Sequence, residues 1–176
     1  MRLVSLSTAL LAAVLASSAL AQESTREEFK EFCQAMQGRW VGEVTWVTDW
    51  PGFGKRGEKV TAYWEARLAE DGNAVIGRFF AGNGSSTSLI CFDGGAKQIR
   101  WTDVDSGGTV GQSIVYKKEG KWRTKSEGSL ADGTKTRFTS TATISEDGNT
   151  WTWEGSGTVG DKPAADRHDV WRRVSK

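Results

Sequence analysis

Residues 59–81 read KVTAYWEARLAEDGNAVIGRFFA, and the pattern of this stretch decides the fold. From 60 to 68 apolar residues occupy every second position and mostly polar residues lie between them, which is the period of a β-strand with one buried face. The tripeptide Asp71-Gly72-Asn73 is typical of a tight turn, and the largely apolar run 74–81 suits a second strand. The stretch therefore predicts a β-hairpin.

Similar units fill the rest of the chain, because Gly-containing turns recur roughly every 11 to 15 residues. The further turns are Gly82-Asn83-Gly84, Asp93-Gly94-Gly95, Ser106-Gly107-Gly108, Glu119-Gly120, Asp132-Gly133 and Asp147-Gly148-Asn149. Strands are expected at 39–48, 59–69, 74–81, 87–92, 97–102, 110–116, 121–126, 135–144, 150–156 and 167–174. About ten strands joined in succession favour an all-β fold, an up-and-down antiparallel β-barrel, and a barrel of that size encloses a cavity.

One short α-helix is expected before the first strand, at residues 24–36. Ser24 and Glu27 have the spacing of a capping box, and Gly38 follows the end of the helix. The helix carries a single apolar stripe, which consists of Phe29, Phe32, Cys33 and Met36. We expect this stripe to pack across one end or one side of the barrel.

Residues 1–21 have the pattern of a cleaved signal peptide. Arg2 is followed by an apolar run and then by Ala19-Leu20-Ala21, a small-residue cleavage site. The apolar run is short for a membrane span, and no positively charged stop follows it. We therefore expect a periplasmic or secreted protein, with no membrane span, in which residues 22–176 form a single domain.

The charge of the chain argues against polyanionic partners. Lys and Arg number 23 and Asp and Glu number 22, so removal of Arg2 with the signal peptide leaves no net charge. No block of like charges occurs, which makes nucleic acids and anionic membrane surfaces poor partners. We expect a monomer or a weak dimer that binds a small molecule.

The two cysteines, Cys33 and Cys91, are expected to form a disulfide in an oxidising compartment. Such a bond would close a loop of roughly 60 residues and stabilise the fold by about 4 kcal/mol. Two free thiols are the alternative. A metal site is disfavoured because no histidine or acidic cluster adjoins either cysteine in sequence.

The residues expected to face inward combine large aromatic groups with small ones. The candidate pocket residues on strands are Trp40, Trp46, Trp64, Trp101, Trp151 and Trp153. Trp50 and Phe53 lie in the loop 49–57, where they either pack against the helix or form a lid over the barrel mouth. The aromatic groups either fill the barrel or line a cavity for a flat or elongated apolar ligand.

Catalytic groups are scarce, and we expect no enzymatic activity. His168 is the only histidine, and no serine lies in the context of a catalytic nucleophile. Asp103 and Asp105 precede a Gly-rich turn, where Asx-type hydrogen bonding explains their spacing without a metal. His168 is either a surface residue or an axial ligand to a haem held in the barrel.

Short motifs resemble those of the calycin superfamily. Gly38-Arg39-Trp40 resembles the Gly-x-Trp motif of lipocalins, and Arg172-Arg173 is similar to the C-terminal basic residue that packs on that tryptophan. Phe92-Asp93, Trp101 and Asp105-Ser106-Gly107 resemble bacterial lipocalin-like families of unknown function. This resemblance implies a β-barrel, often with an internal pocket, and no defined activity.

A weaker similarity connects the chain with the nitrobindins, ten-stranded haem barrels whose proximal histidine lies on the last strand. His168 is the only residue that matches this ligand, and the similarity would imply haem as cofactor. Our leading hypothesis is an exported, lipocalin-like barrel without a cofactor that binds a small apolar or aromatic molecule. The alternatives are a haem protein and a filled barrel that acts as a structural or interaction protein of the envelope.

Overall fold

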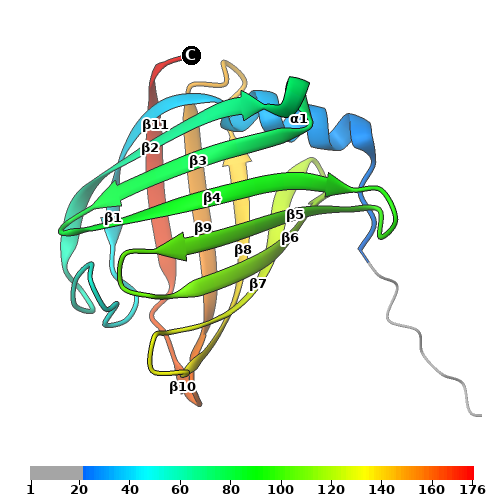
Figure 1. Cartoon of the computed structure of the whole chain (residues 1–176). Helices are drawn as coiled ribbons and strands as arrows, with labels where there is room; N and C mark the ends of the chain where they lie inside the picture. Colours follow the sequence, from blue (N-terminus) through cyan, green and yellow to red (C-terminus); the bar gives the residue numbers. More distant parts are fainter. Residues whose placement is uncertain (1–21) are drawn as a thin grey trace, which may run out of the picture.

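The computed structural model describes residues 22–176, and the expected signal peptide lies outside the described residues. The chain forms a closed antiparallel barrel of 10 strands, preceded by a short helix and joined by one small extra strand (Figure 1). The elements are α1 Arg26–Met36, β1 Gly38–Thr45, β2 Lys59–Ala69, β3 Ala74–Ala81, β4 Gly84–Asp93, β5 Gln98–Asp105, β6 Val110–Lys118, β7 Lys121–Ser129, β8 Lys135–Ile144, β9 Thr150–Val159, β10 Lys162–Pro163 and β11 Arg167–Ser175. The expected fold class is confirmed.

The barrel closes in the order of the sequence. Each long strand pairs with the next one along the chain, β8 pairs with β9, and β11 lies between β9 and β1. The two-residue strand β10 was not expected, and it arises because the loop after β9 folds back onto Thr158 and Val159. Sequential pairing follows from the short turns, which leave each strand no partner nearer than its neighbour.

Helix α1 begins at Arg26, two residues after the start of the expected range, and its cap lies at Thr25, one residue after the expected Ser24. The Thr25 hydroxyl accepts a 3.0 Å hydrogen bond from the Glu28 amide, and the Glu28 carboxylate accepts a 2.8 Å bond from the Thr25 amide. Thr25 and Glu28 therefore form the capping box in place of Ser24 and Glu27. Ser24 is buried and donates to the carbonyl oxygen of Val115, so it attaches the start of the helix to β6.

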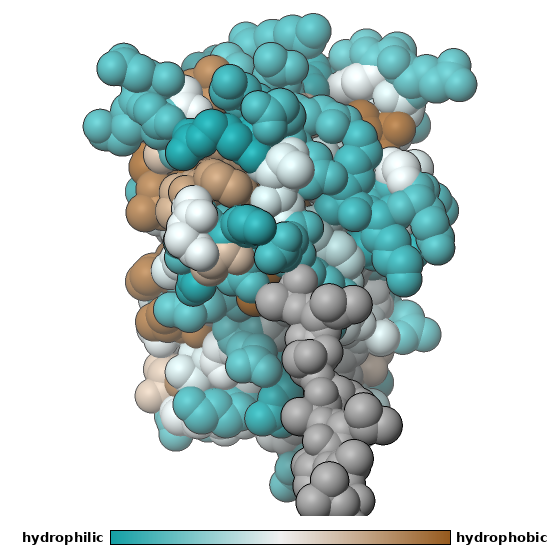
Figure 2. Space-filling model, turned by 90° about the vertical axis from the view of Figure 1, so that its right-hand side faces the viewer, coloured by the Kyte–Doolittle hydropathy of each residue, from teal (hydrophilic) through white to brown (hydrophobic). Residues whose placement is uncertain are grey.

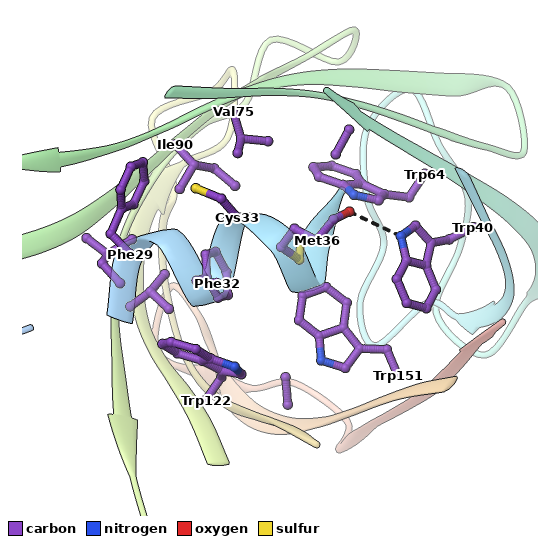
Figure 3. Packing of buried hydrophobic residues seen from close by; sticks show 14 residues of the cluster. Phe29, Phe32, Cys33, Met36, Trp40, Trp64, Val75, Ile90, Trp122 and Trp151 are labelled. Carbon is purple, nitrogen blue, oxygen red and sulfur yellow. Dashed lines mark hydrogen bonds between the residues drawn. The ribbon is translucent and has the colours of Figure 1, made fainter. Parts of the chain in front are cut away.

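The apolar stripe of α1 closes one end of the barrel interior. All four stripe residues are buried, and the Phe32 ring lies 4.9 Å from the Trp122 ring in an edge-on arrangement. Figure 3 shows the helix across the barrel end, where the stripe is surrounded by Val75, Ile90 and the tryptophans Trp40, Trp64, Trp122 and Trp151. Burial of each of the two Phe side chains and of the Met side chain stabilises the folded state by roughly 1.5–3 kcal/mol. The helix therefore forms a packed plug at this end of the barrel.

A basic residue of the last strand holds the other end of α1. The Arg173 guanidinium carbon lies 4.0 Å from the centroid of the Trp40 ring, and its N–H groups donate to the carbonyl oxygens of Ala35 and Gln37. The last turn of α1 has no basic residue of its own, so Arg173 satisfies the carbonyls there. This is the packing that the resemblance to lipocalins implies, and the fold is consistent with a calycin-like barrel.

The expected disulfide is absent, and both cysteines are free. Cys33 lies in the buried stripe of α1, whereas Cys91 lies on β4 between Ile90 and Phe92, whose side chains face inward. Because side chains alternate along a strand, Cys91 points to the outer surface and its sulfur cannot reach Cys33. Burial raises the pKa of the Cys33 thiol to about 11, so the group stays protonated.

The outer surface of the barrel carries apolar groups but no exposed tryptophan among the described residues. Figure 2 shows apolar side chains gathered along one side of a mostly hydrophilic surface. The exposed large apolar residues are Tyr63, Leu68, Phe80, Leu89, Val104, Val110 and Val174. The tryptophans therefore belong to the interior, where the candidate site lies.

Candidate ligand cavity

A cavity of about 300 Å³ lies inside the barrel, between the helix plug and the loop that follows β1. This volume is at the lower end of the range for small-molecule sites. All eight residues proposed from the sequence line it, namely Trp40, Trp46, Trp50, Phe53, Trp64, Trp101, Trp151 and Trp153. Trp171 lines it as well, so every tryptophan except Trp122 faces this one space.

The loop 46–58 lies across the barrel end opposite α1. Phe53 of the loop packs against Gly84, the first residue of β4. Phe92, near the other end of β4, contacts Phe29 of the helix, so the loop and the helix lie at opposite ends of this strand. Gly84 has no space for a Cβ atom because the Phe53 ring occupies it. The loop therefore forms a lid over the mouth, and its aromatic side chains do not pack on the helix.

One hydrogen bond ties this lid to the facing side of the barrel. The Trp50 indole nitrogen donates to Oδ2 of Asp105 at 2.8 Å, and the Trp50 ring lies 6.4 Å from the Phe138 ring on β8. Oδ1 of Asp105 accepts from the amides of Gly107 and Thr109. The Asx-type turn expected at Asp105 is thus present, and the same carboxylate also anchors the lid.

The tryptophans form a continuous aromatic wall. Ring centroids are 5.6 Å apart for Trp64 and Trp101, 6.1 Å for Trp101 and Trp153, and 5.5 Å for Trp151 and Trp153. These residues come from β2, β5 and β9, and the curvature of the closed sheet brings them together. Tilted and edge-on contacts at these distances stabilise the wall and leave ring surface directed at the cavity.

Several indole N–H groups of this wall have no partner in the described part of the chain. The unpartnered buried groups belong to Trp46, Trp64, Trp151 and Trp153. By contrast, Trp40 donates to the carbonyl oxygen of Met36 and Trp101 donates to Asp103. A buried donor without a partner costs about 1–3 kcal/mol, so the wall offers several donors that a ligand's acceptor atoms would satisfy.

The part of the barrel wall formed by β6 to β8, between the tryptophan-bearing strands β5 and β9, is rich in hydroxyl groups. Its cavity-lining side chains are Ser113, Thr124, Ser126, Thr136 and Ser140. The hydroxyls of Ser113 and Ser126 are 2.7 Å apart and bond to each other. The cavity lining therefore combines aromatic rings with small polar groups.

The charged residues that line the cavity were not identified as site residues from the sequence, and they are Asp103, Asp105, Glu127, Arg167 and Asp169. Asp103 on β5 faces inward, where it accepts hydrogen bonds from Trp101 and from the Ser88 hydroxyl. Arg167 and Asp169 on β11 line the cavity, and the Arg167 Nε atom lies 3.6 Å from Oδ2 of Asp169. The sequence pattern that could have identified Asp103 is the period of two along the strand, because it puts Asp103 on the same face as Trp101.

Burial dominates the electrostatics of Asp103, Arg167 and Asp169. Desolvation raises the pKa of Asp103, and the hydrogen bonds from Ser88 and Trp101 oppose it only in part. Desolvation also raises the pKa of Asp169 against the attraction of Arg167, and it lowers the pKa of Arg167. Each shift disfavours the charged form of its group, as expected for charges removed from water.

His168 lies outside the cavity. Its side chain is 64% exposed, and its Nδ1 atom is 3.3 Å from Oε1 of Glu154 on the outer face of β9. Arg167 and Asp169, its neighbours on β11, point inward because side chains alternate. An axial ligand has to face the bound haem, so His168 is not in position to hold one inside the barrel.

Two further features concern residues 22–176 only. No group of three or more His, Cys, Asp and Glu side chains in this part has the arrangement of a metal site. Within the same residues, no helix is long and apolar enough to cross a membrane.

Comparison with known proteins adds no assignment. No family model matches the chain, and no curated protein matches it significantly in sequence. The barrel and its cavity are therefore the basis for any statement about function.

Proposed function

We propose that this protein binds a small, flat and largely apolar molecule inside its barrel, as an exported lipocalin-like carrier. The observation that carries the proposal is the cavity of about 300 Å³, which is walled by tryptophans whose indole N–H groups are partly unpartnered. An interior filled by its own side chains would not leave this volume. The features of residues 1–21 support action in the periplasm or outside the cell.

The composition of the walls indicates what kind of molecule fits. Ring faces of Trp64, Trp101 and Trp153 suit an aromatic or alicyclic body, which stacks or packs edge-on against them. The unpartnered indoles require acceptor atoms, such as carbonyl, ether or hydroxyl oxygens. We therefore expect a ring-containing ligand with one or more oxygen or nitrogen acceptors, in preference to a plain hydrocarbon chain.

Tryptophan fluorescence tests this proposal directly, because nearly all the tryptophans face the cavity. We expect saturable changes in emission when ring-containing compounds from a lipid and aromatic library are added to the purified protein. Native mass spectrometry of protein recovered from an exporting host should also show a bound small molecule. The proposal fails if no compound changes the emission and no bound mass is found.

A pair of variants on β6 locates the binding. Ser113 faces the cavity, whereas Gln112 beside it is exposed on the outer face. Ser113→Phe places a ring in the cavity and should abolish the fluorescence response, while Gln112→Phe adds the same ring outside and should preserve it. Equal responses of the two variants would place the ligand elsewhere and contradict the proposal.

A further inference from the structure

The interior charges of the barrel do not balance. The carboxylates of Asp103, Asp105 and Asp169 line the cavity, and the guanidinium of Arg167 is the only basic group that lines it in the described chain. Glu127 also borders the cavity, but its side chain is 80% exposed and lies 3.7 Å from Arg137 at the rim. The buried part of the cavity thus has more acidic than basic groups.

The three carboxylates differ in how well they are compensated. Asp105 accepts hydrogen bonds from Gly107, Thr109 and Trp50, which satisfy both of its oxygens. Asp169 is only 5% exposed, and its Oδ1 atom has no hydrogen-bond partner among the described residues. The carboxylate also lies 3.6 Å, through Oδ2, from Nε of Arg167 and is affected by a backbone hydrogen bond from Thr45. Asp169 therefore presents an unsatisfied acceptor inside the cavity.

Arg167 is shared between two carboxylates. Its charge acts on both Asp103 and Asp169, which lie on β5 and β11. One guanidinium cannot neutralise two buried carboxylates, and the pKa of each carboxyl is raised by burial. A positively charged donor placed between them would supply the missing charge and the missing hydrogen bond.

The aromatic wall adjoins the same carboxylates. Trp101 donates to Asp103, and Trp153 is the cross-strand neighbour of Asp169 on β9. The rings of Trp101 and Trp153 are 6.1 Å apart. A cation held by these carboxylates would therefore lie beside two tryptophans, and Trp is the best aromatic partner for a cation that reaches its ring face.

We propose that the ligand is an organic cation, with a protonated amine that binds between Asp103 and Asp169 and a ring that packs against the tryptophan wall. This inference rests on the proposed function and specifies its ligand class. An anionic ligand would bring a further negative charge to a cavity in which one guanidinium already serves two carboxylates. A neutral ligand would leave Oδ1 of Asp169 with at most one neutral donor.

Three compounds with the same ring and linker test the charge of the ligand. Tryptamine is cationic, tryptophol is neutral and indole-3-propionate is anionic at neutral pH. Isothermal titration calorimetry of the full protein should show tryptamine binding about tenfold or more tightly than tryptophol, because charge-assisted hydrogen bonds and cation–π contacts add to the common ring contacts. Indole-3-propionate should bind most weakly.

Variants test whether the preference for tryptamine over tryptophol depends on the two carboxylates. Asp169→Asn and Asp103→Asn keep the shape of the side chain and should each reduce the preference for tryptamine over tryptophol severalfold, without weakening tryptophol. Glu154→Gln removes an exposed carboxylate from the outer face of β9, outside the cavity, and should preserve the preference. Equal loss of preference in the Glu154→Gln control would mean long-range attraction by the surface and would overturn the assigned contact.

The outcomes separate this inference from the function on which it rests. If tryptophol binds, Ser113→Phe abolishes that binding, and tryptamine binds no more tightly, the cation proposal fails while the ligand-binding function stands. Tightest binding of indole-3-propionate overturns the cation proposal in favour of an anion held by Arg167. If none of the three compounds binds, the cation proposal fails, and the fluorescence screen decides the proposed function independently.

Discussion

The Trp50 indole donates a 2.8 Å hydrogen bond to Oδ2 of Asp105, and this bond joins the lid of the barrel to the turn between β5 and β6. The same carboxylate organises that turn through its other oxygen, which accepts the Gly107 and Thr109 amides. The lid and the turn are thus held by one side chain. Movement of the lid requires that Trp50 leave Asp105.

Trp50→Phe should loosen the lid while it keeps an aromatic ring. Loss of a hydrogen bond to a carboxylate costs roughly 1.5–3 kcal/mol, so we expect faster amide hydrogen exchange in residues 46–58 and faster ligand dissociation. Trp46→Phe is the matched control, because the Trp46 N–H has no partner to lose. Similar exchange in the two variants would show that the Trp50–Asp105 bond does not hold the lid.

Arg173→Gln should destabilise the protein by about 2–3 kcal/mol. The change removes the guanidinium from the face of Trp40 and removes the donors to the carbonyl oxygens of Ala35 and Gln37. Urea unfolding measures the loss. The exposed neighbour Arg172 provides the control, since Arg172→Gln should change the free energy of unfolding by less than about 0.5 kcal/mol.

Stability should fall as the pH rises because of Asp103 and Asp169. A carboxyl group whose pKa is raised in the folded state binds its proton more tightly there, so the folded protein binds more protons than the unfolded chain. The free energy of unfolding therefore decreases from the ordinary carboxyl pKa of about 4 upward. The double variant Asp103→Asn and Asp169→Asn should lack this contribution.

Unfolding in urea at several pH values above about 5 measures this contribution. The stability of the double variant relative to the unaltered protein should increase with pH, since only the unaltered protein loses stability by ionising these groups. Titrating groups that do not interact with the two carboxyls are common to both proteins and cancel in the difference. A constant difference across the range would contradict the role of the two carboxyls.

The two cysteines should differ in reactivity and should not be linked. Iodoacetamide added to the native protein should modify Cys91 and spare Cys33, because burial excludes the reagent and the Cys33 pKa of about 11 suppresses the thiolate. Unfolded protein should be modified at both positions. An intact mass lower by two hydrogens before reduction would instead show a disulfide.

Local patterns in the sequence were sufficient for most of the secondary structure. The period of two and the Gly-rich turns predict every long strand to within a few residues, as at Lys59–Ala69 and Ala74–Ala81. The helix cap was misplaced by one residue because both Ser24 and Thr25 are suitable caps with an acidic residue three positions later. The spacing does not show that the Ser24 hydroxyl donates instead to the carbonyl oxygen of Val115 on β6.

The errors concern contacts between distant segments. Cys33 and Cys91 appeared to be partners because only two cysteines occur, but the face of β4 that bears Cys91 is turned outward. Asp103 was assigned with Asp105 to a turn, because both precede glycines. The strand continues through Asp103 to Asp105, so Asp103 follows Trp101 into the interior.

The sequence by itself determined the strands, their order and the alternation of faces, because these depend on residues close together in the chain. It also indicated the aromatic lining, since the tryptophans share one face of their strands. Only the tertiary structure decided which groups meet across the barrel. Closure of the barrel brings Asp103 of β5 close enough to Arg167 on β11 for their charges to interact, and it leaves His168 on the outer face. The physical reason is that alternation of side chains defines two faces of each strand, but only closure of the sheet decides which face is inside.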